Sequence, residues 1–185
     1  MIITLLRHGE VIEEYQGKYN GHIDIPLSKN GKLQVIQIAA TLKNENFDAI
    51  YCSDLLRAKQ TLEAFEYKVT PILTKNLREK SWGIHEGKSF QEIEESGIKY
   101  KNFEQWLNDL DGENSQEYIN NTYKYFKDNI IDSQNKNILI VTHSGLIKSI
   151  LSLLLKIPME ESFSKNLPYS SYIKLEKNDN TFRIL

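Results

Sequence analysis

The stretch ILIVTHSGLIKSILSLLL, residues 138–155, has the pattern of a strand, a polar turn and a helix in direct succession. Residues 138–141 form a short aliphatic run of the kind found in buried strands. Thr142-His143-Ser144-Gly145 interrupts this run, and apolar positions then continue to Leu155 as a predicted helix. A buried strand followed directly by a helix indicates an α/β fold.

Strands and helices alternate along the rest of the chain. Strands are predicted at five further apolar runs: residues 2–6, 47–52, 71–73, 172–175 and 182–185. The last two runs flank Asn178-Asp179-Asn180, which is a turn signal and predicts a hairpin. The alternation predicts an α/β three-layer sandwich, in which helices flank a mostly parallel central sheet.

Two helices are predicted between the first strands. The first covers residues 28–44 and begins with Ser28, a residue type that caps helices well. Its apolar residues recur at helical spacing and include Leu33, Ile36 and Ala40. The second is expected to have Ser53 or Asp54 as its N-cap and to reach about Phe65.

The segment from about 83 to 137 is polar and rich in lysine, so we expect it to lie at the surface. It is predicted to hold one or two short helices and a longer helix over about 115–131. Aromatic residues, Phe103 and Trp106 among them, supply its apolar contacts. Because the sequence has no linker and no internal repeat, it indicates a single domain, 1–185, with this segment as a small helical cap.

Composition narrows the classes of function. The 185 residues include 23 basic and 25 acidic side chains, a balance that argues against an electrostatic nucleic-acid binder. No apolar run is long enough to span a membrane, and the single cysteine, Cys52, excludes an intrachain disulfide. These features predict a cytoplasmic protein with no membrane and no nucleic-acid partner. Arginine is scarce and occurs only as Arg7, Arg57, Arg78 and Arg183, so each position is informative.

Polar residues follow three of the predicted strands. These are Arg7-His8-Gly9, Ser53-Asp54-Leu55-Leu56-Arg57 and His143-Ser144-Gly145. In α/β sheets the carboxyl ends of strands and the N-termini of helices meet at one edge, so these residues can converge on one crevice. Arginines bind phosphate oxygens, and a neutral imidazole can accept a phosphoryl group. Such a set needs a carboxyl group to protonate the leaving oxygen, and we expect it to need no metal.

Five blocks of sequence resemble the histidine phosphatase superfamily, the phosphoglycerate mutase-like group whose first motif is Arg-His-Gly. They occur in the family's order over about 140 residues: LLRHGE (5–10), GKYNGHIDIPLS (17–28), YCSDLLRAKQT (51–61), LREKSWGIHEG (77–87) and IVTHSG (140–145). The first motif alone is a weak signal, whereas the ordered set is specific. The resemblance implies a phosphoglycerate mutase-like fold.

The resemblance also implies which residues react. His8 would be the nucleophile that forms a phosphohistidine. Glu79 would be the general acid, and then the base that activates water. Glu10, Glu86 and Glu113 compete with Glu79 for this role.

A further set of residues would hold the phosphoryl group. By the same resemblance, Arg7, Arg57 and His143 would bind its oxygens. The backbone N–H of Ser144 would add a contact at the start of a helix. Asn20 would lie in the loop that borders the substrate pocket.

The sequence departs from the family pattern at three places. Val11 and Glu14 stand where the family often has Thr and an Asn that touches phosphate. Asn121 stands where an Arg is expected. The geometry of the first loop and one substrate-facing or structural contact are therefore open.

The superfamily contains phosphatases and mutases, which share the first half-reaction. A mutase needs extra cationic groups, yet no arginine lies between Arg78 and Arg183, and the 83–137 segment is shorter than in cofactor-dependent mutases. The sequence therefore favours a metal-independent phosphatase acting on a small phosphomonoester. A cofactor-dependent phosphoglycerate mutase is the alternative, with Lys88, Lys99 and Lys101 as candidate groups for a second anion. A phosphoprotein phosphatase acting as a regulator is an alternative of another class, as is a binding module without the chemistry.

The short cap and residues 103–109, FEQWLND, are similar to α-ribazole phosphatases. This similarity implies α-ribazole 5′-phosphate, a nucleotide-like intermediate of cobalamin biosynthesis, as a substrate. The expected partner is a small phosphorylated substrate, and no cofactor or metal is expected. The sequence leaves the oligomeric state open, with a homodimer as one option.

Overall fold

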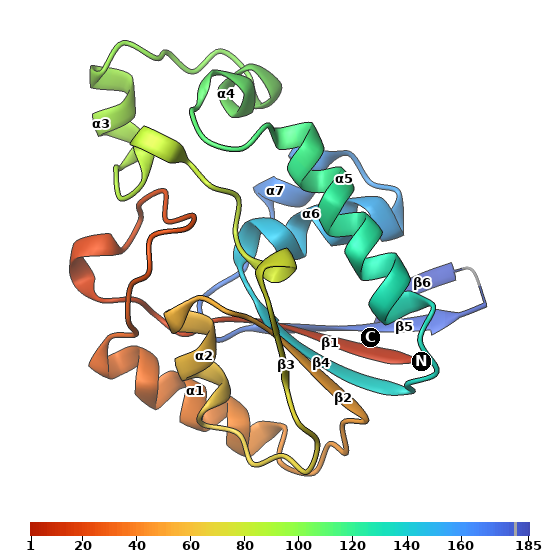
Figure 1. Ribbon diagram of the computed structural model, residues 1–185. Helices are drawn as coiled ribbons and strands as arrows, with labels where there is room; N and C mark the ends of the chain where they lie inside the picture. Colours follow the sequence, from red (N-terminus) through yellow and green to blue (C-terminus); the bar gives the residue numbers. More distant parts are fainter. Residues whose placement is uncertain (180) are drawn as a thin grey trace.

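A computed structural model describes residues 1–179 and 181–185. Within these residues, six strands form one sheet in the order β3-β2-β4-β1-β5-β6 (Figure 1). They are β1 (Ile2–Arg7), β2 (Ala49–Ser53), β3 (Ile72–Thr74), β4 (Asn137–Thr142), β5 (Tyr172–Asn178) and β6 (Thr181–Ile184). The first four strands run parallel to one another, and β5 and β6 are antiparallel to their neighbours.

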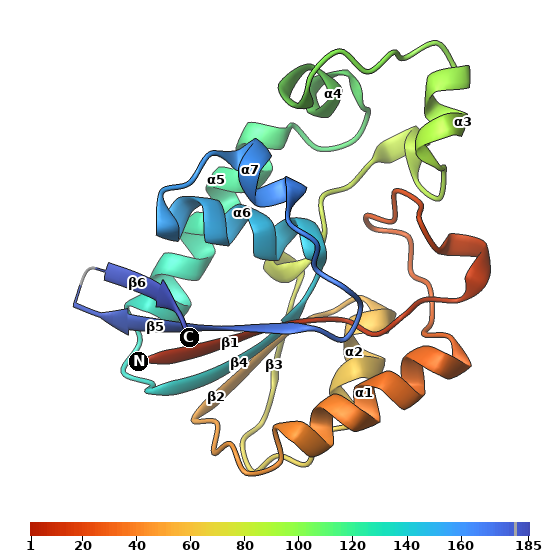
Figure 2. The ribbon, with the colours of Figure 1, turned by 180° about the vertical axis from the view of Figure 1, so that it is seen from behind.

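Helices cover both faces of the sheet, as Figures 1 and 2 show. The α-helices are α1 (Lys29–Thr41), α2 (Leu56–Leu62), α3 (Phe90–Glu95), α4 (Phe103–Asp109), α5 (Ser115–Phe126), α6 (Ser144–Leu155) and α7 (Met159–Ser164). One face packs against α1 and α2, and the other packs against α5 and α6. The predicted three-layer sandwich with a mostly parallel sheet is confirmed.

The central strand β4 contributes to both layers of the core. Ile138 and Ile140 pack with α5 and α6, whereas Leu139 and Val141 pack on the opposite face with α2. Successive side chains of a strand face opposite sides, so a strand covered on both faces is apolar throughout. The aliphatic run 138–141 therefore suits the position between β2 and β1.

Helix α1 begins where the sequence predicts, because the Ser28 hydroxyl accepts a hydrogen bond from the Gly31 N–H. The residues that pack inward are not the apolar residues whose spacing predicted the helix. The side chains of Leu33 and Ile36 are 62% and 57% exposed, and Gly31 and Val35 are buried instead. A β-carbon at Gly31 would overlap the carbonyl oxygen of Glu10. Glycine therefore lets the helix pack directly against the backbone of Glu10, and this contact determines which face of the helix is buried.

The predicted N-caps of α2 were wrong. Leu55 occupies the N-cap position, and its side chain makes no capping hydrogen bond. The Leu56 N–H donates instead to Asp24 Oδ1 at 2.6 Å, from a distant loop. The side chains of Ser53 and Asp54 contact other segments, so the cap comes from tertiary structure.

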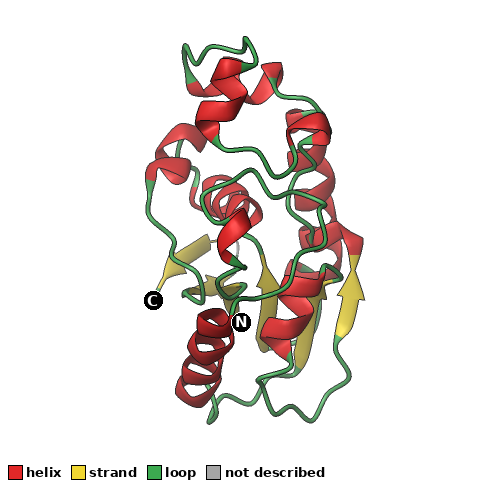
Figure 3. Ribbon diagram, turned by 90° about the vertical axis from the view of Figure 1, so that its left-hand side faces the viewer, coloured by secondary structure: helices red, strands yellow, loops and turns green. Residues whose placement is uncertain are grey.

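The 83–137 segment has the predicted helical content. In Figure 1, α3 and α4 lie farther from the sheet than α5 and α6, and the side view of Figure 3 shows helices extending well beyond the strands. A π-helical turn, Lys127–Ile131, extends α5 over the predicted range. This part has its own small apolar cluster of Trp82, Ile93, Trp106 and Leu110. Its role as a cap stays a prediction. Helix α7, which follows α6, was not predicted.

The last two strands form the predicted antiparallel pair. Of the expected turn between them, Asn180 lies outside the described residues. None of the helices in the described part of the chain is long and apolar enough to cross a membrane.

Candidate active site

The carboxyl ends of β1, β2 and β4 bring three distant residues together. His8 directly follows β1, Arg57 lies in the first turn of α2 after β2, and His143 directly follows β4. The imidazole centroids of His8 and His143 are 5.1 Å apart. All three side chains are buried, with exposures of 6%, 1% and 1%. Buried groups of this polarity are rare without partners or function, so this edge of the sheet is the candidate site.

The imidazole of His8 is held in one tautomer. Its Nδ1 lies 2.8 Å from the carbonyl oxygen of Gly9, and a carbonyl can only accept, so Nδ1 carries the proton. Nε2 therefore keeps its lone pair. Burial lowers the pKa of His8 well below its ordinary 6.5, and the positive charges of Arg57 and Arg7 lower it further. The ring is thus neutral and nucleophilic at physiological pH.

Arg7 is fixed by the loop that precedes β5. Its Nη1 donates to the Leu167 carbonyl at 2.6 Å, and the guanidinium lies 3.9 Å from the centroid of the Tyr169 ring. Its Nε is buried and has no hydrogen-bond partner among the described residues. Tyr169 also lies beside His8, with ring centroids 5.6 Å apart. No sequence motif marks Tyr169, and sequence reasoning missed it.

Arg57 is held by three backbone carbonyls of one loop. Nη1 donates to Ile23 at 2.8 Å, and Nη2 donates to Asn20 at 3.0 Å and to Gly21 at 2.7 Å. Burial lowers the pKa of Arg57 to about 10, so the guanidinium stays charged at neutral pH. Its Nε is also buried without a partner in the described part of the chain.

His143 has one paired and one unpaired ring nitrogen. Nε2 lies 2.8 Å from the Ser53 hydroxyl, whereas Nδ1 is buried without a partner among the described residues. Burial lowers the pKa of His143 well below 6.5, and Arg57 and His8 add to this effect. The ring is therefore neutral, and it can donate from Nδ1 when the Ser53 hydroxyl donates to Nε2.

Asn20 and Ser144 lie in the same cleft as His8 and Arg7. The Asn20 side chain donates from Nδ2 to the Tyr15 carbonyl, and its Oδ1 is buried without a partner among the described residues. Ser144 is the first residue of α6, so its N–H lies at the positive end of that helix. Their proposed contacts with substrate stay predictions.

Glu79 is positioned by β4 and by the start of α6. Its Oε2 accepts from the Gly145 N–H at 2.8 Å, and its Oε1 accepts from the N–H of the next residue, Lys80, at 3.1 Å. The Thr142 hydroxyl donates to the Leu77 carbonyl and ties the segment before Glu79 to the sheet. A β-carbon at Gly145 would overlap the Glu79 carboxyl group, so a larger residue there would displace that side chain. Burial raises the pKa of Glu79 above its ordinary 4.5, which favours the protonated form.

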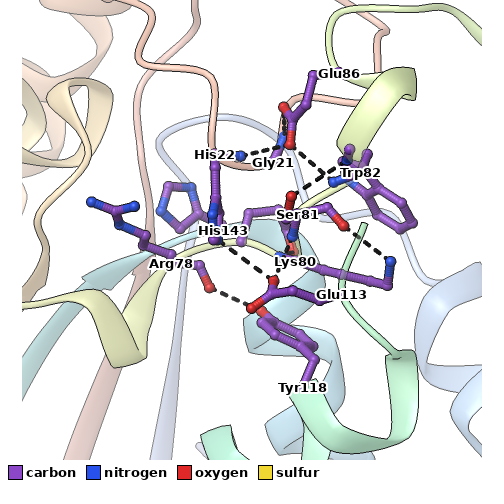
Figure 4. A network of polar contacts seen from close by, with 12 residues as sticks. Gly21, His22, Arg78, Lys80, Ser81, Trp82, Glu86, Glu113, Tyr118 and His143 are labelled. Carbon is purple, nitrogen blue, oxygen red and sulfur yellow. Dashed lines mark hydrogen bonds and ion pairs between the residues drawn. The ribbon is translucent and has the colours of Figure 1, made fainter. Parts of the chain in front are cut away.

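The competing carboxylates have structural contacts. Glu10 accepts from the Ser28 hydroxyl, Glu113 accepts from the Ser81 N–H, and Glu86 accepts only backbone N–H groups. Figure 4 shows Glu113 and Glu86 in this polar network. Among the described residues that line the cleft, Glu79 is the one carboxylate.

The cleft over His8 has a volume of about 200 Å³ and an aromatic rim. Its walls include Lys18, Tyr19, Trp82, Phe163 and Tyr169. The three lysines considered for a second anion do not line this cleft within the described structure. Lys18 does, and sequence reasoning missed it.

The three departures from the family pattern have different settings. Val11 is buried in the core, where its apolar side chain fits, and Glu14 is exposed in a 3-10 turn, Glu13–Tyr15. Asn121 lines a separate hollow of about 360 Å³, together with Arg78. Arg78 pairs with Asp54 through Nε at 2.6 Å and Nη2 at 2.7 Å.

Comparison with known proteins gives the family. A family model described as the histidine phosphatase superfamily (branch 1) matches residues 3–185. The chain belongs to the histidine phosphatase superfamily. This confirms the resemblance carried by the five sequence blocks and identifies the chain as an enzyme of the phosphomonoester hydrolase class.

Members of the superfamily similar to this chain include phosphatases and mutase-like proteins. An adenosylcobalamin/α-ribazole phosphatase of Escherichia coli is 25% identical over 195 residues, covering 100% of this chain and 95% of the relative. Phosphoglycerate mutase-like protein 4 of Arabidopsis thaliana is 31% identical over 157 residues, covering 80% and 68%. The solved α-ribazole phosphatase of Shigella flexneri has a TM-score of 0.86 at 23% identity, covering 100% and 95%. This likeness confirms the fold.

Proposed function

We propose that this protein is a metal-independent phosphatase that hydrolyses a small phosphomonoester through a phosphohistidine on His8. One observation carries the proposal. Three buried nitrogens have no partner in the described chain, Arg7 Nε, Arg57 Nε and His143 Nδ1, and they belong to side chains that act on the neutral His8 imidazole by contact or by charge. Buried donors are almost always paired, so a converging unpaired set favours an anion with several acceptor oxygens.

The first half-reaction follows from these groups. His8 Nε2 attacks phosphorus while the bond from phosphorus to the leaving oxygen breaks. The protonated carboxyl group of Glu79 gives its proton to that oxygen, which leaves as an alcohol. The two guanidinium groups stabilise the charge on the transferring phosphoryl group. The Gly9 carbonyl accepts from Nδ1–H and stabilises the cationic phosphohistidine.

The second half-reaction releases phosphate. The Glu79 carboxylate now takes a proton from water, and the water oxygen attacks phosphorus. The bond from phosphorus to Nε2 breaks, and the imidazole recovers its lone pair. Glu79 is again protonated, so the enzyme returns to its starting state.

The size and chemistry of the cleft support the substrate class. A volume of about 200 Å³ suits a small phosphomonoester better than a folded protein. The aromatic rim can cover a flat ring, which is compatible with α-ribazole 5′-phosphate, and relatives named α-ribazole phosphatase support this substrate. The cap formed by residues 83–137 would border that rim.

A phosphoglycerate mutase is the second candidate, because several relatives are named phosphoglycerate mutase or mutase-like and Lys18 lines the cleft. A mutase must hold a second anionic group while it returns the phosphoryl group. In the described cleft lining, Lys18 and Arg7 are the cationic residues, and Arg7 belongs to the phosphoryl set. The scarcity of cationic residues for a second anionic group favours transfer of the phosphoryl group to water.

The test uses the purified protein in EDTA with p-nitrophenyl phosphate, α-ribazole 5′-phosphate and 3-phosphoglycerate. We expect hydrolysis in EDTA, and we expect His8→Ala to abolish it. Arg183→Ala is the control, because Arg183 pairs with Glu176 on the last two strands and does not line the cleft. An active His8→Ala protein, or a requirement for added Mg²⁺, would refute the mechanism. Interconversion of phosphoglycerates without net hydrolysis would assign the mutase.

A further inference from the structure

One loop lies between a guanidinium and a carboxylate of opposite charge. Its carbonyls at Asn20, Gly21 and Ile23 accept from Arg57. Its N–H groups at Gly21, His22 and Ile23 donate to Glu86, and Figure 4 shows Gly21 and His22 beside that carboxylate. We call residues 20–23 the clamp loop.

Glu86 accepts four backbone hydrogen bonds. Three come from the clamp loop, from the N–H groups of Gly21 at 2.8 Å, His22 at 2.8 Å and Ile23 at 3.2 Å. The fourth comes from Trp82 at 2.9 Å, in the segment that carries Glu86 itself. One carboxylate therefore fixes the clamp loop to the 81–86 segment, and bonds to a charged acceptor are stronger than neutral ones.

The fit between these segments is close. A β-carbon at Gly21 would overlap both the Lys80 carbonyl oxygen and the Glu86 carboxylate. Glycine at position 21 therefore lets the clamp loop pack closely against Lys80 and Glu86. The carbonyl oxygens of the same loop lie 2.7–3.0 Å from the terminal nitrogens of Arg57.

We propose that Glu86 is a positioning residue for Arg57, acting through the clamp loop. The proposal rests on the function proposed above, in which Arg57 stabilises the transferring phosphoryl group. Glu86 orients the loop peptides, the loop carbonyls hold both terminal nitrogens of Arg57, and the buried Nε, which has no partner among the described residues, is left for the phosphoryl oxygens. Glu86 does not line the cleft in the described structure, and its negative charge also favours the charged form of Arg57, so it acts on the reaction through Arg57.

Replacing Glu86 with glutamine tests the inference. The amide keeps one acceptor oxygen and places an NH₂ group against N–H donors, so the clamp loop loses part of its support. Because a displaced donor weakens stabilisation of the transition state, we expect kcat/KM for p-nitrophenyl phosphate to fall on the order of 10-fold. The effect should lie mainly in kcat.

A double-mutant cycle separates positioning from a general loss of stability. Glu86→Gln is measured in the wild-type background and in an Arg57→Lys background. If Glu86 acts through Arg57, its effect in the second background shrinks to less than about 2-fold. Orthovanadate, a mimic of the transferring phosphoryl group, gives a second readout. Its affinity should fall with Glu86→Gln only when Arg57 is present.

The matched control is Asp48→Asn. Asp48 also accepts two backbone N–H bonds, from Lys136 and Asn137, but it lies at the opposite edge of the sheet. The Asp48→Asn variant should have a lower free energy of unfolding and an unchanged kcat/KM. If Glu86→Gln does not fold, Glu86→Asp keeps the charge, and the same cycle is run with it.

Equal effects of the Glu86 variants in both backgrounds, or no effect in either, would overturn the inference. A wild-type protein without phosphatase activity, or an active His8→Ala variant, would instead overturn the proposed function. The two failures are therefore distinguishable.

Discussion

Glu79 and Glu86 belong to the same segment, and their surroundings give them different chemistry. Glu79 lines the cleft, and burial raises its pKa. Glu86 directs its oxygens to four N–H groups away from the cleft. Spacing in the sequence cannot separate two such carboxylates, because both follow the same motif. The three-dimensional contacts show that Glu79, and not Glu86, lines the cleft.

Replacing Glu79 with glutamine should remove the basic limb of the pH–rate profile. The acid is active only when protonated, so kcat falls as pH rises through its raised pKa, above the ordinary 4.5. For an alkyl phosphate we expect Glu79→Gln to lower kcat by about 10²–10⁴-fold. The loss should be smaller for p-nitrophenyl phosphate, whose leaving group needs little protonation. Steady-state rates across pH with both substrates make the measurement.

Glu113→Gln is the control for this prediction. Glu113 contacts the Ser81 N–H and His22, outside the cleft. That variant should keep the basic limb. If it loses the limb while Glu79→Gln keeps it, Glu113 is the acid.

The residues of the site were predictable to different degrees. His8 and His143 each lie two residues after an apolar run, so the predicted end of a strand indicates where they lie. Tyr169 comes from a loop before β5, and its contact with Arg7 depends on how that loop returns to the site. The hydroxyl of Thr61 accepts from the Gly9 N–H beside His8, a contact between two sequence blocks that spacing does not reveal.

At the scale of elements, α1 shows that helical periodicity does not identify the buried face. Leu33 and Ile36 form an exposed apolar stripe, and Val35 packs inward near Gly9. We expect Val35→Ala to lower the free energy of unfolding by about 1–3 kcal/mol. Leu33→Gln and Ile36→Gln should change it by less than about 0.5 kcal/mol. Urea titrations of the three variants make the comparison, and a larger cost for the exposed positions would contradict the packing described.

The fold itself was largely predictable, because its strands are continuous apolar runs. A short apolar run between predicted helices can form few structures other than a buried strand. All of the predicted strands occur in the structure. The failures involve tertiary contacts or short elements. Asp24 caps α2 from a distant loop, which local sequence cannot show. Helix α7 has only 6 residues, too few for a periodic pattern.

At the scale of the whole molecule, two neutral histidines buried beside two arginines make stability depend on pH. The folded-state pKa values of His8 and His143 lie well below 6.5, so the unfolded chain binds more protons in acid. Their contribution to the free energy of unfolding is fully present above about pH 6.5. It is lost as the pH falls from there toward the lowered pKa values of the folded protein. Each histidine adds a slope of up to about 1.4 kcal/mol per pH unit in that window.

His143→Gln isolates one of these contributions, because glutamine keeps a hydrogen-bond donor and does not titrate. The variant's free energy of unfolding should fall less steeply than that of the wild type between about pH 6.5 and 5. Glu79 has the opposite sign, since its raised pKa makes stability fall as pH rises through it, and it remains in both proteins. The difference between them therefore reports His143 alone. Urea unfolding across this range decides the matter, and parallel curves for wild type and His143→Gln would mean that His143 is charged in the folded protein.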